Sequence, residues 1–149
     1  MKLGKWLFVV LALVVGGIVL SGCVAAPAQM APASGTGDAL FINLTSDDPH
    51  RVNMALSFGM KQLDRGHPLT VFLNDKGVYV GSAANASKFT EQQKTIAALL
   101  KSGAVVFICP MCMEHYGIKQ ADLIPGLKVS DPAAIGEHLF KPNTQTLTW

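Results

Sequence analysis

The chain has 149 residues, of which 50% are hydrophobic and 15% are charged. A length of this order accommodates one domain, and a formal net charge of +2 without a basic patch argues against nucleic-acid binding. Lys2 and Lys5 account for that excess, so the chain beyond residue 22 is formally neutral.

The first residues have the pattern of an export signal. The two lysines form a basic start, residues 7–20 are almost all apolar, and Leu-Ser-Gly-Cys at residues 20–23 ends the stretch. About fourteen apolar residues fall short of the roughly twenty that span a bilayer. The stretch resembles the bacterial lipobox, which implies cleavage before Cys23 and lipid on its thiol. We therefore expect residues 1–22 to be a lipoprotein signal peptide and the domain to be extracytoplasmic, lipid-anchored to a bacterial membrane and facing the periplasm.

The next segment, residues 23–37, has small side chains, prolines and no charge. Nothing in it is large enough to anchor a core, so we expect the lipidated Cys23 followed by a flexible tether. Residues 38–149 are then expected to form one folded domain.

From Ala39 onwards, short apolar runs alternate with amphipathic stretches, a pattern typical of strand–helix–strand units. Strands are expected at residues 39–44, 69–73, 104–108, 127–129 and 146–149, with a brief extension at 78–80. Helices are expected between the polar turn at 45–49 and Gly66, from an N-cap at Thr90 to Gly103, after Cys109, and from Pro132 to Phe140. We expect the fully apolar 104–108 run to be central. The predicted fold is a single three-layer α/β domain, flavodoxin- or Rossmann-like, with a mostly parallel sheet of about five strands.

The chain has three cysteines, and two of them, Cys109 and Cys112, form a C-x-x-C pair directly after the apolar run at 104–108. These thiols therefore fall where a strand ends and a helix begins. A thiol at a helix start faces free backbone N–H groups, which favour the reactive thiolate. A structural disulfide across so short a loop would add little stability, so we interpret the pair as reactive.

Polar residues also follow the first two predicted strands. In a parallel sheet, functional groups gather beyond the carboxyl ends of the strands. We therefore expect candidate neighbours of the thiols at Thr45, Ser46 and Asp47 and at Asn74 and Asp75. Roles in turns and helix caps remain the simpler interpretation for Asp47, Asp48 and Asn74.

Several short motifs, taken together in order and spacing, resemble the DsrE/DsrF-like family of small sulfur-relay proteins. They are Ala55-Leu56-x-Phe58, Gly66-His67, Val71-Phe72-Leu73, Gly77-Val78, Phe107-Ile108-Cys109-Pro110-Met111-Cys112, Tyr116-Gly117-Ile118 and Leu147-Thr148-Trp149. The resemblance covers essentially all of residues 38–149.

The resemblance implies a compact α/β domain that often assembles into trimers or hexamers. It also implies a cysteine, here Cys109, that accepts sulfane sulfur as a persulfide and hands it on. We expect Cys112, one helical turn along, to be able to resolve that persulfide as a disulfide. Such a sulfurtransferase or sulfur carrier requires no cofactor. Its partners would be thiol or persulfide donor and acceptor proteins, or small polysulfides.

Two other functions remain open for the same segment. Cys109, Met111, Cys112, Met113 and His115 are soft or borderline ligands suited to Cu(I) or Zn(II). The two methionines cannot both face the cysteine side of a helix, so the metal alternative uses Cys109 and Cys112 with His115 or Met111. The second alternative is a dithiol–disulfide redox couple. No chemistry is assigned to the other histidines, His50, His67 and His138.

Overall fold

A computed structural model of the protein describes residues 37–149. The expected signal peptide, the lipidated Cys23 and the tether as far as residue 36 lie outside the described residues. In the part that is described, no helix is long and apolar enough to cross a membrane.

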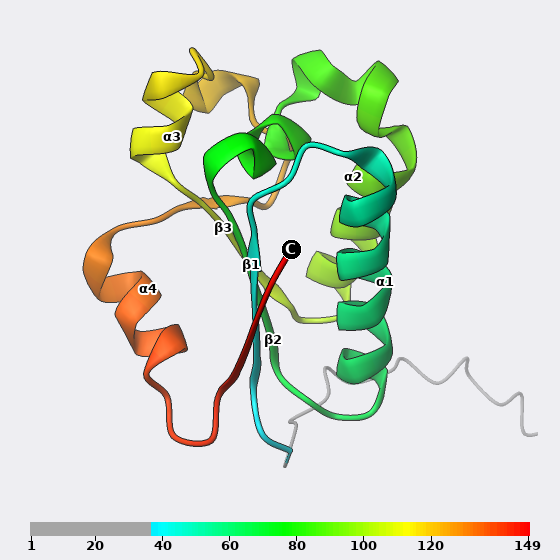
Figure 1. The fold of residues 1–149 in the computed structure, drawn as a ribbon, viewed down its shortest axis with the longest axis vertical. Coiled ribbons are helices and arrows are strands. Elements are labelled where there is room, and N and C mark those ends of the chain that lie inside the picture. Colours follow the sequence, from blue (N-terminus) through cyan, green and yellow to red (C-terminus); the bar gives the residue numbers. More distant parts are fainter. Residues whose placement is uncertain (1–36) are drawn as a thin grey trace, which may run out of the picture.

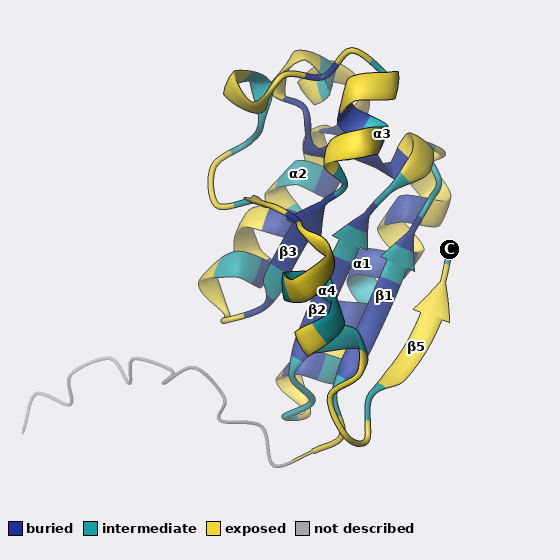
Figure 2. Ribbon diagram, turned by 90° about the vertical axis from the view of Figure 1, so that its left-hand side faces the viewer, coloured by how far each residue is buried: buried dark blue, intermediate teal, exposed yellow. Residues whose placement is uncertain are grey.

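Five strands form one sheet in the order β4-β3-β2-β1-β5, and every neighbouring pair is parallel. The strands are β1 (Leu40–Leu44), β2 (Leu69–Leu73), β3 (Val105–Ile108), β4 (Lys128–Val129) and β5 (Gln145–Thr148). Their carboxyl ends all point to the same edge of the sheet, as the arrowheads in Figure 2 show. The expected parallel α/β fold is confirmed.

Helices cover both faces of this sheet. The α-helices are α1 (Pro49–Asp64), α2 (Ala86–Lys101), α3 (Pro110–His115) and α4 (Pro132–Leu139), and the 3₁₀ helices are η1 (Asp75–Gly81), η2 (Ala83–Asn85) and η3 (Gln120–Asp122). Figure 1 shows α1 and α2 on one side of the sheet, α4 on the other, and α3 beyond the end of the strands. The three layers are therefore α1 with α2, the sheet, and α4.

The core lies mainly between the sheet and the α1–α2 layer. Alternate strand residues that face this layer are buried, and they are Leu40, Ile42, Leu44, Leu69, Val71, Leu73, Val106 and Ile108. On the opposite face, α4 has no fully buried residue, and β5 is exposed along its length. The firmly packed strands β1, β2 and β3 thus supply a rigid base for whatever their carboxyl ends carry.

The structure corrects three of the expectations. Residues 78–80 belong to η1 and not to a strand, because Val78 and Val80 are completely buried in the core and that burial overrides their β propensity. Helix α2 begins at Ala86, ahead of the expected N-cap at Thr90, whose hydroxyl instead donates back to the carbonyl of Ala86. The middle strand is β2, and β3 lies beside it, between β2 and β4.

His138 lies in the last turn of α4 and packs against the face of the sheet that α4 covers. Its Nδ1 lies 2.8 Å from the hydroxyl oxygen of Thr70, and the ring meets Phe107 edge-on. Burial lowers the pKa of His138 from 6.5, because the charged imidazolium is less well solvated there.

This lowered pKa predicts a loss of stability in acid. The unfolded chain binds the proton more tightly, so the contribution of His138 is present above pH 6.5 and is lost as the pH falls towards the folded pKa. Urea unfolding above and below pH 6.5 should show a larger decrease in the free energy of unfolding for the unsubstituted chain than for His138→Gln. Equal decreases for the two chains would contradict this prediction.

Candidate functional site

Cys109 stands at the junction of β3 and α3. Its backbone N–H donates to the carbonyl of Leu73 at 2.9 Å and extends the β2–β3 ladder, while its carbonyl accepts the N–H of Met113 at 2.9 Å and begins the helix. The Cys109 side chain is the N-cap, and its Sγ accepts the N–H of Cys112 at 3.4 Å. Both thiols are free and partly exposed. The expected position, at a strand end and a helix start, is confirmed.

At the starts of two other helices, the N-cap side chain accepts a hydrogen bond from a backbone N–H, as that of Cys109 does. Three α-helices begin with an N-cap residue followed by proline, which suits the first helical position because its missing N–H would be unpaired there anyway. In α1 and α4 the cap is a carboxylate, Asp48 or Asp131, that accepts the N–H three residues on at 2.8 or 2.9 Å. Cys109 therefore presents sulfur where α1 and α4 present an anionic oxygen.

Cys112 is held by a different element. Its Sγ accepts the backbone N–H of Asp75 at 3.2 Å, although the two residues are 37 positions apart. Burial raises the pKa of the Cys112 thiol, the neighbouring Cys109 raises it further, and the N–H of Asp75 opposes both. The thiolate form is therefore disfavoured at Cys112.

Asp75 and Tyr116 link η1 to the far end of α3. The Tyr116 hydroxyl donates to Oδ1 of Asp75 at 2.5 Å, and this bond to a carboxylate raises the pKa of Tyr116 to about 12. Behind this bond, the rings of Tyr79 and Tyr116 pack with their centroids 5.0 Å apart. Asp75 therefore binds α3 twice, through its backbone at Cys112 and through its carboxylate at Tyr116.

The turn that carries Asp75 is itself pressed against β1. The N–H of Asn74 donates to the carbonyl of Leu44 at 3.0 Å, and a Cβ on Gly77 would lie 2.1 Å from that same oxygen. Only glycine fits this approach. Asp75 also has a positive φ of 44°, a conformation that Asp tolerates better than most residues.

The other polar residues expected near the thiols have structural contacts instead. Thr45 donates its hydroxyl to the carbonyl of Trp149, Asp47 pairs with Lys88 at 2.8 Å, and the Asn74 side chain donates to that of Asn43. The Lys88 ammonium lowers the pKa of Asp47. Of the five candidate neighbours, Asp75 is thus the one that forms a hydrogen bond to a thiol.

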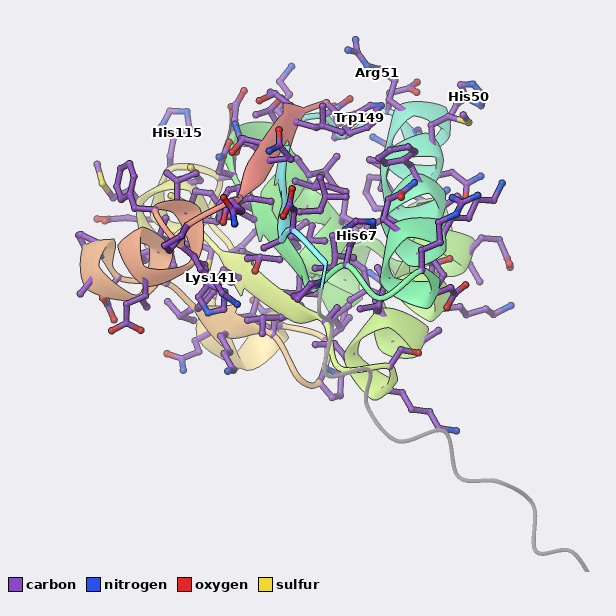
Figure 3. All side chains as sticks on the ribbon, turned by 90° about the horizontal axis from the view of Figure 1, so that it is seen from below. His50, Arg51, His67, His115, Lys141 and Trp149 are labelled. Carbon is purple, nitrogen blue, oxygen red and sulfur yellow. The ribbon has the colours of Figure 1, made fainter. Side chains whose placement is uncertain are left out.

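The remaining soft ligands of the segment point in different directions. Met111 is 78% exposed, Met113 is buried in the core, and His115 is exposed and projects away from the domain in Figure 3. Among residues 37–149, no three His, Cys, Asp or Glu side chains gather closely enough to bind one metal ion. Any metal at this segment would depend on the two thiols of Cys109 and Cys112.

The opposite environments of the two methionines predict opposite effects of truncation. Met113→Ala should lower the free energy of unfolding by about 2–5 kcal/mol, because it removes buried volume and leaves a cavity. Met111→Ala should change it by less than about 0.5 kcal/mol, as is usual for an exposed position. Urea unfolding of the two variants measures both. A large loss from Met111→Ala would place that side chain in the core and contradict the arrangement.

Neither of two hollows in the described surface touches the thiols. One of about 270 Å³ lies at the amino ends of the strands, beside Thr70, His138 and Lys141. Another of about 240 Å³ lies between α1 and β5, beside Phe58 and Leu147. The chemistry of the cysteines is a stronger indication of function than either hollow, so we place the site at the carboxyl edge of the sheet.

Comparison with known proteins agrees with this geometry. The sequence profile of the DsrE/DsrF-like family matches residues 39–143, which include all of the site residues described above. The chain belongs to the DsrE/DsrF-like family. Membership suggests a role related to sulfur relay.

One relative of this DsrE/DsrF-like protein is the uncharacterized protein MJ0989 of Methanocaldococcus jannaschii. It is 33% identical over 81 residues, which make up 54% of this chain and 71% of the relative. Two solved structures share the fold. The first is MTH1491 from Methanobacterium thermoautotrophicum, a protein of unknown function, with a TM-score of 0.63 and 16% sequence identity; the match covers 75% of this chain and 99% of that one. The second is the ychN protein from E. coli, with a TM-score of 0.62 and 15% sequence identity; the match covers 76% of this chain and 99% of that one.

Tyr116 is the site residue of this DsrE/DsrF-like protein that the residue types alone did not single out. Its signal was its spacing, because Cys112 and Tyr116 are four apart and so lie on the same side of a helical turn. Its hydrogen-bond partner, Asp75, lies 41 positions away in the sequence, and the fold brings the two side chains together.

Proposed function

We propose that the protein carries sulfane sulfur as a persulfide on Cys109 and delivers it to an acceptor thiol. The observation that carries this proposal is the Cys109 sulfur itself, partly exposed and accepting the N–H of Cys112 at a position where two other helices place a carboxylate. A partly exposed sulfur can be reached by a sulfur donor, and attack on other sulfur atoms is the characteristic chemistry of cysteine as its thiolate. Family membership supports the same role.

The transfer needs no cofactor. The Cys109 thiolate attacks the terminal sulfur of a polysulfide, and a new S–S bond forms at Cys109. The S–S bond next to that sulfur breaks, and the shortened polysulfide leaves as an anion with the electron pair. An acceptor thiolate then attacks the outer sulfur and releases the Cys109 thiolate with its electron pair. Atoms and charge balance in both steps, and no external oxidant is consumed.

The cellular setting is part of the proposal and is supported by the sequence. The lipobox-like residues 20–23 support a chain anchored by lipid on Cys23 outside the cytoplasm, where thiol or persulfide proteins and small polysulfides are the candidate partners. Assembly into a trimer or hexamer is supported by the exposed edge strand β5 and by the exposed apolar side chains of Phe58, Phe140 and Leu147.

Mass spectrometry of the protein after exposure to polysulfide tests the function. We expect the peptide that contains Cys109 to gain one sulfur mass, which thiol reductants remove. A Cu(I) titration run beside it tests the metal alternative, for which the two thiols are the available ligands. Tight, stoichiometric Cu(I) binding without a sulfur adduct would replace the sulfur carrier with a copper-binding protein.

A further inference from the structure

A persulfide next to a second thiol has a chemical weakness. The sulfur of Cys112 can attack Sγ of Cys109, so that a Cys109–Cys112 disulfide forms and the bond to the outer sulfur breaks. The outer sulfur leaves with the electron pair, takes the proton of the Cys112 thiol, and is lost as hydrogen sulfide. This step balances without an oxidant, and it destroys the cargo that a carrier must keep.

One contact of Cys112, its hydrogen bond to the loop after β2, opposes this loss. Its Sγ is bound to the backbone N–H of Asp75 at 3.2 Å, so an attack on Cys109 must break or strain that hydrogen bond. The donor lies on η1, which is fixed to β1 by the bond between Asn74 and Leu44. The sulfur of Cys112 is therefore tied to an element that does not belong to its own helix.

The tie is maintained by Tyr116. Asp75 has a positive φ of 44°, which is costly for a residue other than glycine, and relaxation of this turn would reorient the peptide planes on either side of Asp75. The Tyr116 hydroxyl, 2.5 Å from the Asp75 carboxylate, opposes that relaxation. Asp75 is exposed, so core packing alone does not hold its side chain in place.

We propose that Asp75 and Tyr116 are positioning residues. They hold the Cys112 sulfur in a hydrogen bond that it must give up before it attacks a persulfide on Cys109, and so make this site a carrier that retains sulfur instead of releasing it as hydrogen sulfide. The inference rests on the proposed function, because it concerns the lifetime of the same persulfide. In this proposal, the loop after β2 controls how long a persulfide survives on Cys109 at the end of β3.

The test compares Tyr116→Phe with Tyr79→Phe in a full chain that also carries Cys23→Ser. The first variant removes the hydroxyl that binds Asp75 and keeps the ring. The second removes a hydroxyl with no recorded hydrogen bond in the described residues, from the ring that packs against Tyr116. After loading with polysulfide and removal of the excess, mass spectrometry follows the Cys109 persulfide and the Cys109–Cys112 disulfide, and a sulfide assay follows release.

We expect the persulfide that forms in Tyr116→Phe to decay roughly two- to tenfold faster than in the parent chain, the range that loss of one hydrogen bond gives. Disulfide and sulfide should appear at the same rate, and Tyr79→Phe should decay like the parent. Addition of Cys112→Ala to Tyr116→Phe should abolish the fast decay, which a general loss of structure would not do. Equal decay in the parent and Tyr116→Phe would overturn the inference.

A second measurement keeps the test independent of the proposed function. An aromatic disulfide such as dithiobis(nitrobenzoate) reacts with Cys109 to give a mixed disulfide and one coloured thiolate, and attack by Cys112 then releases a second. The second release should be faster in Tyr116→Phe than in the parent, even if polysulfide does not load Cys109. If polysulfide does not load Cys109 but the second thiolate is released faster in Tyr116→Phe, the sulfur carrier is rejected and the positioning role is kept. If polysulfide loads Cys109 but the second release is unchanged in Tyr116→Phe, the positioning role is rejected and the sulfur carrier is kept.

Discussion

Replacement of Cys109 by serine is expected to abolish sulfur loading while leaving the domain folded. A hydroxyl retains the ability to cap α3 by accepting the N–H of Cys112, so the helix start should survive. It lacks the nucleophilic and polarisable sulfur that attacks a polysulfide, so no adduct should form. Mass spectrometry after polysulfide exposure measures the loss, and thermal unfolding verifies the fold.

Cys112→Ser provides the matched control for this substitution. It makes the same atomic change three residues away and leaves the backbone N–H that donates to Cys109 in place. We expect this variant to load sulfur at Cys109 and to form no internal disulfide. If sulfur appeared at residue 112 of Cys109→Ser as readily as at residue 109 of the parent chain, the assignment of the nucleophile would be wrong.

Gly77→Ala is expected to have the largest effect on stability among substitutions in the loop after β2. The added methyl group would lie 2.1 Å from the carbonyl oxygen of Leu44, a distance at which the backbone must move. We expect the free energy of unfolding to fall by about 3 kcal/mol, the upper end of the usual cost of overpacking. Because η1 also carries Asp75, the hydrogen bond to Cys112 should be lost together with the contact to β1.

Gly136→Ala is the control for the same chemical change. A Cβ on Gly136 meets its nearest neighbour, Cδ2 of Phe140, at 3.9 Å, which is ordinary contact. Because Gly136 lies within α4, alanine should raise the free energy of unfolding by up to about 1 kcal/mol. Urea unfolding of both variants gives the comparison. Equal effects would show that η1 can move away from β1 at no cost.

The position of Cys109 followed from local sequence. An apolar run of strand length, then cysteine, then proline, predicts a strand end and a helix start, because proline has the φ of the first helical position and no N–H to leave unpaired. Asp48-Pro49 and Asp131-Pro132 begin α1 and α4 by the same rule. Such signals depend on one or two residues and are not changed by distant contacts.

Local patterns failed where burial decided the outcome. The triplet at 78–80 has the β-branched and aromatic residues of a strand, but no strand of the described sheet pairs with it and its valines are buried in a 3₁₀ turn. Thr90 has the residue type of a cap, but α2 begins one turn earlier and is interrupted at Phe89, which is buried. Propensity is a weak constraint where a large apolar side chain has a site in the core.

Residues close together in the chain were enough to predict the parallel α/β fold, the strand that leads to the cysteines, and the place of Cys109 at the start of a helix. The tertiary structure alone decided what the second cysteine contacts. It joined Cys112 to Asp75 across 37 residues and Asp75 to Tyr116 across 41, and it left Met111 exposed and His115 projecting away from the domain. Parallel strands bring their carboxyl ends to one edge, but side-chain packing decides which of the residues gathered there come into contact.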